Sequence, residues 1–156
     1  MAKGNEIVVT ANPKGNFLGG TIKGAVKPGI LVQVRATPFV GGKPVFEPFA
    51  PGTDGKTGWV GVLMADSLQG KLATDALTDG AECQVYCPVK GDYLNVLAGE
   101  VAGTGNTYAL GDMLGTDAED GLLVPDSSFT VRPFVVLEAV TQQAAPILLF
   151  VMYTGG

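Results

Sequence analysis

The chain lacks histidine, has little charge and contains no long apolar run, and each absence excludes a class of function. Its 156 residues include no histidine, so a site that needs this common general base and metal ligand is excluded. Charged residues make up 16% of the chain, below the roughly 25% of a typical domain. The longest strongly apolar run, Ile147–Tyr153, is far shorter than the about 20 residues of a transmembrane helix. We therefore interpret it as a buried strand and expect a soluble protein with no membrane partner.

Cysteine is also scarce, since Cys83 and Cys87 are the only two, in the stretch CQVYCPVKGDYLNVLAG. The β-branched and aromatic residues here predict strands over Glu82–Cys87 and Tyr93–Val96, joined by a turn at Lys90–Asp92. Within a strand the two cysteine Cα atoms lie about 13 Å apart, too far for a disulfide. A zinc site would need further ligands that the chain does not offer. We expect two buried apolar thiols and no metal or cofactor.

Other candidate chemical motifs are incomplete. Gly55–Thr57 ends like a phosphate-binding loop, but Ala50 stands where such a loop requires its first glycine. Gly103–Gly105 begins like a dinucleotide-binding loop, but Tyr108 occupies the third glycine position. The acidic cluster Asp117–Asp120 lacks the alternating carboxylates of a calcium loop, so a solvated turn is the favoured interpretation. The sequence therefore predicts no catalytic residue, and we expect that the protein is not an enzyme.

Strand signals recur along the chain between glycine and proline turns, without a long helical period. The clearest expected strands are Leu31–Ala36, Trp59–Met64, Glu82–Cys87, Phe134–Val140 and Ile147–Tyr153. One short helical turn is possible in the more polar stretch 67–77. This pattern predicts an all-β fold in which residues 24–156 form a single small β-barrel or β-sandwich domain.

The leading segment differs from the rest, and we predict that residues 1–23 form an extended N-terminal arm. An ordinary first strand of the same sheet is the alternative. Residues 1–35 carry five basic side chains against one acidic side chain, whereas the chain as a whole has a net charge of −5. A basic arm would dock on an acidic protein surface, unless its lysines are simply solvated. The candidate contact residues are Lys3, Ile7, Val8, Val9, Thr10 and Lys14.

Two compositional features bear on partners. The low charge, together with a mean hydropathy of +0.29, predicts that part of the surface is covered in an assembly. No basic stripe interleaves with aromatic residues, so nucleic acid is not an expected partner. The sequence alone therefore favours a protein partner or further copies of the chain.

The order of turns and hydrophobic segments is the most informative feature of the chain. VKPGILVQV is followed by VLMADSLQGK and DGAECQVYCPVKGDYLNVLAG, then by LGDML, DGLLV, RPFVVLEAVT and ILLFVMYTG. This arrangement resembles the small head decoration, or capsid cement, proteins of tailed bacteriophages. The resemblance covers most of residues 24–153 and is carried by turns and hydrophobic positions.

The resemblance implies a tulip-like β-domain without enzymatic activity, often trimeric, whose N-terminal arm reaches onto the capsid. Such a protein is made in the host cytoplasm and sits on the outer surface of the virion head. Its partner is the major capsid protein, whose lattice it stabilises at three-fold and quasi-three-fold positions against the pressure of packaged DNA.

Two other classes of function remain open at this point. A carbohydrate-binding or adhesin-type β-sandwich would need an exposed aromatic platform, for which Trp59 with Tyr86, Tyr93 or Tyr108 are the candidates. A polysaccharide-cleaving enzyme would need carboxylates that converge in a cleft.

Overall fold

The computed structural model contains β-strands and no helix among the residues that it describes. These are residues 7–9, 13–36, 40–50, 58–64, 75–99, 106–116, 120–125, 132–141 and 146–155. Accordingly, no helix in these ranges is long and apolar enough to cross a membrane. The predicted all-β fold class is confirmed.

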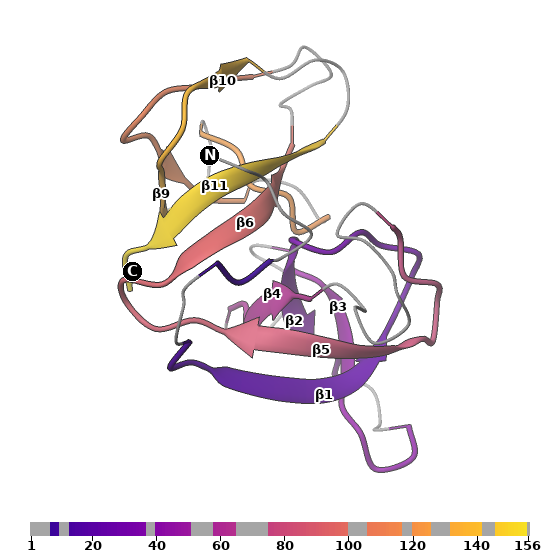
Figure 1. Ribbon diagram of the computed structural model, residues 1–156. Coiled ribbons are helices and arrows are strands. Elements are labelled where there is room, and N and C mark those ends of the chain that lie inside the picture. The colour runs from indigo at the N-terminus through magenta and orange to yellow at the C-terminus, as the bar shows by residue number, and fades with distance from the viewer. Residues whose placement is uncertain are drawn as a thin grey trace.

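Five strands close into a barrel, which fills the lower half of Figure 1. They are β1 (Asn16–Ile22), β2 (Leu31–Val34), β3 (Val45–Pro48), β4 (Gly61–Leu63) and β5 (Glu82–Cys87). The order around the barrel is β1-β3-β2-β4-β5, and β5 pairs back to β1. All the pairs are antiparallel except β1 with β3, which is parallel.

The remaining strands form the upper half of Figure 1. Four of them make an antiparallel sheet in the order β6 (Tyr93–Ala98), β11 (Ile147–Tyr153), β9 (Phe134–Val136) and β8 (Met113–Leu114). A separate pair joins β7 (Thr107–Tyr108) to β10 (Val140–Thr141). The chain passes from barrel to sheet through the short turn between β5 and β6, so this turn ties the two layers together.

Two hydrophobic cores arise because barrel strands alternate their side chains between two sides. Leu31 and Val62 join a core between barrel and sheet, whereas their neighbours Val32 and Leu63 fill the barrel. The barrel core is Ile22, Ile30, Val32, Phe46, Leu63, Leu77, Cys83, Val85 and Leu97. The interlayer core is Ile7, Leu31, Phe49, Val62, Tyr86, Leu94, Val96, Ala98, Tyr108, Leu114, Leu123, Phe134, Val136, Leu149 and Val151.

The expected boundary between an arm at 1–23 and a domain at 24–156 does not coincide with the start of the barrel. Strand β1 lies inside the expected arm and pairs with β5 from Asn16↔Cys87 to Thr21↔Glu82. A Cβ atom on Gly20 would lie 2.5 Å from the Phe46 ring and from a backbone oxygen. Glycine at this position therefore allows the strand to pack closely.

Two predicted strands, Glu82–Cys87 and Ile147–Tyr153, match β5 and β11 at both ends. The predicted turn between β5 and β6 is also present, with Gly91 at a φ of +95°. Most of the expected helical turn at 67–77 lies outside the described residues.

Candidate functional site

The four-stranded sheet has an additional short segment at its β6 edge, formed by Ile7–Val9. Val8 bridges Leu94 in antiparallel register. The Val9 N–H donates to the Tyr93 carbonyl at 2.9 Å, and the Asn95 N–H donates to the Ile7 carbonyl at 2.7 Å. Because the polar groups of a strand alternate in direction, the N–H and C=O of Val8 point away from β6. Among the described residues they have no hydrogen-bond partner, so Val8 forms an open sheet edge.

The structure brings together three of the six predicted contact residues. Ile7 is buried in the interlayer core, and Val8 and Val9 are half-buried at the sheet edge. Lys14 is exposed just before β1. Lys3 and Thr10 lie outside the described residues. Contact of these residues with a capsid stays a prediction, with the refinement that Ile7 is already engaged inside the fold.

Beside this edge, a buried hydrogen-bond group fixes the turn between the barrel and the sheet. The Tyr86 hydroxyl donates to the Asp92 carboxylate at 2.6 Å and accepts from the Gly15 N–H at 3.0 Å. The same carboxylate oxygen accepts from the Val89 N–H at 2.9 Å. Burial and the hydrogen bond to Asp92 raise the pKa of Tyr86 to about 12, so the phenol keeps its proton throughout the neutral range.

The same turn is joined to the end of β11. The Gly91 N–H donates to the Tyr153 carbonyl, and the Tyr153 N–H donates to the Asp92 carbonyl, each at 2.8 Å. The ends of β5, β6 and β11 are thus held by one set of hydrogen bonds. A side chain mounted at this junction has a fixed position relative to both layers.

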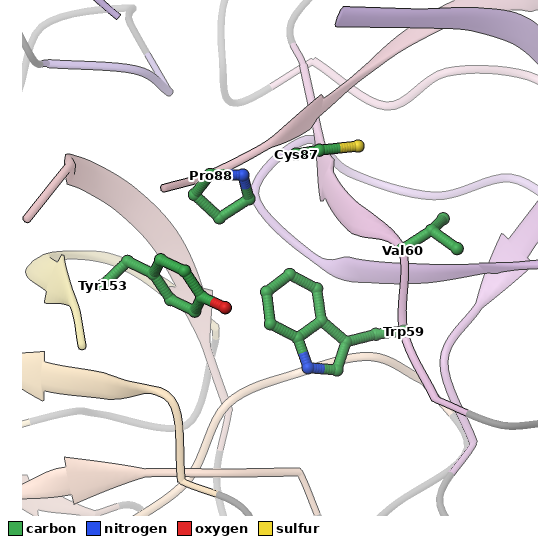
Figure 2. A pocket seen from close by; sticks show the side chains of 5 residues that line it. All are labelled: Trp59, Val60, Cys87, Pro88 and Tyr153. Carbon is green, nitrogen blue, oxygen red and sulfur yellow. The ribbon is translucent and has the colours of Figure 1, made fainter. Parts of the chain in front are cut away.

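A pocket of about 240 Å³ lies at this junction, lined by Trp59, Val60, Cys87, Pro88 and Tyr153. Figure 2 shows that the Tyr153 hydroxyl points toward the indole of Trp59. The two rings meet edge-to-face with centroids 5.7 Å apart. Within the described part of the chain, no hydrogen bond occupies the indole N–H or the Tyr153 hydroxyl. The pocket therefore offers an aromatic wall and the Tyr153 hydroxyl, without a charged side chain.

The two cysteines differ in environment. Both are free thiols. Cys83 packs in the barrel core, where burial raises its pKa to about 11, so its expected packing role is confirmed. Cys87 is half-buried and lines the pocket, and burial raises its pKa as well. Thiols of this kind are poor nucleophiles at neutral pH. Within the described ranges no three cysteine, aspartate or glutamate side chains gather as a metal site would require.

The expected aromatic platform is arranged differently from the prediction. Tyr86 and Tyr108 are fully buried, and Tyr93 stacks on Phe150 with ring centroids 5.9 Å apart. Trp59 instead packs against Phe134 and Tyr153. Sequence reasoning missed the Trp59–Tyr153 pair, because the two residues are far apart in the chain and no local pattern links them.

Comparison with known proteins shows what fold the chain has. No family model matches the sequence, and no curated protein matches it. Among solved structures, it is similar to the crystal structure of the head fiber gp8.5 N base in bacteriophage phi29. The TM-score is 0.55 at 16% sequence identity, over 90% of this chain and 94% of that chain. At this identity the likeness shows a shared fold, and it spans almost the whole of both chains.

Proposed function

We propose that this protein is a structural component of a phage head, which binds the outer capsid surface and stabilises the major capsid lattice as a decoration protein. The observation that carries the proposal is the fold shared with a phage head fiber base over 90% of this chain. The resemblance of the turn and strand motifs to capsid cement proteins supports it independently. The proposed role is mechanical and non-enzymatic, and it involves neither nucleic acid nor a cofactor.

The proposed assembly is a trimer at the three-fold and quasi-three-fold positions of the head. A chain with only 16% charged residues is expected to cover part of its surface with further copies. A trimer would bridge several capsid subunits at once, so that its separate weak contacts would add up to a stable attachment.

The open edge at Val8 suggests how the capsid is bound. A capsid segment in extended conformation would pair with the outward N–H and C=O of Val8, and so extend the sheet by one strand. The exposed Lys14, in the mainly basic leading segment, would favour an acidic capsid surface. Ile7 would hold the segment in place through its burial in the interlayer core.

The variant Val8→Pro tests this proposal, because proline removes the outward-pointing N–H of the open edge and leaves both hydrogen bonds to β6 in place. Val9→Pro is the matched control, since it removes the N–H that bonds to Tyr93 inside the fold. We expect Val8→Pro to stay folded, with a small loss of melting temperature because the Val8 side chain packs on the interlayer core, and to lose cosedimentation with undecorated heads. Val9→Pro should lower the melting temperature. Undiminished head binding by a folded Val8→Pro protein would refute strand pairing at Val8, and failure of the wild type to bind heads would refute the function.

A second candidate function, glycan binding, is favoured by the pocket alone. An aromatic wall with one hydroxyl and no charge suits a neutral sugar ring, whose C–H face stacks on an indole. Titration with neutral monosaccharides, followed by Trp59 fluorescence, tests this candidate. Tyr153→Phe should weaken binding without unfolding the protein, and an unchanged fluorescence in the wild type would exclude this function.

A further inference from the structure

The first half of β1 forms a second open edge of the fold. Strand β3 pairs with β1 only at Thr21 and Ile22. Among the described residues, residues 16–20 therefore have a strand neighbour on one side alone, which is β5. In Figure 1 this part of β1 runs along the lower border of the barrel. Residues 16–19 are all exposed, so a further strand has access to this edge.

The polar groups of the backbone are available along this edge. The Thr21 N–H points to the β3 side, where it donates to the Pro44 carbonyl at 3.0 Å. Because these groups alternate in direction along a strand, the N–H and C=O of Phe17 and of Gly19 point to the same side. Within the described part of the chain no hydrogen bond occupies them. Both residues can therefore pair with another strand.

This edge has none of the features that normally protect an open strand. Natural edges carry lysine or proline, or are interrupted by a bulge. Residues 16–20 read NFLGG, without charge or proline, and pair with β5 in continuous register. Phe17 is 48% exposed and Leu18 is 39% exposed. An unprotected edge with exposed apolar side chains indicates a surface for strand pairing.

The hydrogen bonds already made by the chain fix the register of such a pairing. Gly15 and Thr21 flank the edge, but their N–H groups are bonded within the chain. Only Phe17 and Gly19 remain, so the incoming strand must offer two residues with the same spacing. A second copy of β1 in antiparallel direction does so, with Phe17 of each copy opposite Gly19 of the other. Leu18 of both copies then lies at the two-fold axis.

The side chains are complementary in this register. A Cβ atom on Gly19 would have nothing within 4 Å, so the space above this glycine is open. The Phe17 ring contacts Tyr86 at a centroid distance of 4.9 Å and is half exposed. Since Phe17 and Gly19 lie on one face of β1, each Phe17 ring would cover Gly19 of the other copy, as aromatic residues do opposite glycines in sheets. The edge carries no charge, so two copies meet without repulsion.

We infer that β1 pairs with β1 of a second copy about a two-fold axis at Leu18, which joins the two barrels through a continuous sheet. The contact is isologous, because each copy contributes the same surface. With two paired residues from each copy it is small and therefore weak, and it is strengthened where copies are held side by side. The inference goes beyond the proposed function, since a trimer needs a separate three-fold contact and the two-fold contact would link neighbouring trimers.

Disulfide formation by the variant Leu18→Cys tests the inference. Two cysteines at the axis would have Cα atoms about 4.5 Å apart, within the range of a disulfide. Val34→Cys is the matched control, since Val34 lies in barrel strand β2 and is 40% exposed, against 39% for Leu18. The wild type gives the background of Cys83 and Cys87. Under mild oxidation, non-reducing electrophoresis should show a covalent dimer of Leu18→Cys forming at least about tenfold faster than in both controls.

A second substitution separates strand pairing from random collision. Gly19→Glu, added to Leu18→Cys, has room in the free protein, but it would place a charge where the Phe17 ring of the other copy lies. The covalent dimer should form at least about tenfold more slowly, with little change in melting temperature. Equal rates with and without Gly19→Glu, or equal rates for Leu18→Cys and Val34→Cys, would overturn the inference. Loss of head binding by Gly19→Glu with an unchanged dimer rate would assign the edge to the capsid.

The inference and the proposed function fail in different ways. A covalent dimer of Leu18→Cys in a protein that does not bind heads would refute the capsid role and support the two-fold contact. Head binding by Leu18→Cys without a covalent dimer, in solution or on the head, would do the reverse.

Discussion

The substitution Tyr86→Phe is expected to destabilise the fold far more than Tyr153→Phe, although each removes one hydroxyl oxygen. Tyr86 is fully buried, and its hydroxyl serves both the Asp92 carboxylate and the Gly15 N–H. The substitution keeps the ring and its contact with Phe17, at a centroid distance of 4.9 Å. It removes one hydrogen bond to a charged group and leaves the Gly15 N–H without its acceptor. Together these losses should lower the free energy of unfolding by about 2–3 kcal/mol.

Urea denaturation measures this loss, and Tyr153→Phe is the control. The Tyr153 hydroxyl has no hydrogen bond within the described part of the chain, so its removal should change the unfolding free energy by less than about 0.5 kcal/mol. A loss below about 0.5 kcal/mol for Tyr86→Phe as well would refute the anchoring role of this hydroxyl.

The pH dependence gives an independent check. The phenol ionises near 10.0 in the unfolded chain, whereas the pKa of Tyr86 in the folded protein is about 12. Below pH 10 the folded and unfolded states both hold this proton, and the stabilising contribution is complete. As the pH rises from 10 to about 12 the unfolded state loses the proton first, so the wild type loses stability. Tyr86→Phe lacks this loss, and the stability gap between the two proteins should narrow in that window. A constant gap would contradict the assignment.

Three further predictions concern the barrel. Cys83→Ala should lower the free energy of unfolding by about 1 kcal/mol, because it leaves a small cavity, and native Cys83 should react slowly with thiol reagents as followed by absorbance. Gly20→Ala should destabilise the protein in thermal unfolding, because its methyl group would lie 2.5 Å from a ring and a backbone oxygen, whereas Gly19→Ala, with nothing within 4 Å, should be neutral. Deletion of residues 2–20 should abolish the cooperative unfolding transition in circular dichroism, because it removes most of β1. Deletion of residues 2–6 should preserve this transition. Equal effects of the two deletions would contradict the assignment of β1 to the barrel.

Local sequence patterns were sufficient to predict the strands that carry strong local signals. Glu82–Cys87 and Ile147–Tyr153 are dense in β-branched and aromatic residues, and glycine or proline follows each of them closely. Their bounds depend on the residues themselves, so a sequence is enough to find them. The turn at Gly91 was predictable for the same reason.

The strand β1 was not predictable in this way. Gly19 and Gly20 lower its intrinsic strand preference, and its identity as a strand comes from pairing with β5 on one side and with β3 on the other. These partners are distant in sequence, and the parallel pairing with β3 has no local signature. The residues therefore seemed to belong to an arm, although they close the barrel.

The candidate site likewise depends on pairing between distant segments, which the local sequence does not predict. The sequence of Ile7–Val9 does not reveal that Val8 pairs with β6 and leaves one edge open.

Strands β2 and β4 contribute to both hydrophobic cores, and this arrangement limits how the fold can evolve. Strands β2 and β4 present consecutive residues to opposite cores, and Leu97 of β6 reaches into the barrel. The barrel and the sheet are therefore not separable units. A barrel alone would expose Leu31 and Val62 to solvent, and a sheet alone would expose Leu97. New functions in such a chain must arise in its loops, edges and outer faces, while the barrel and the sheet are inherited together.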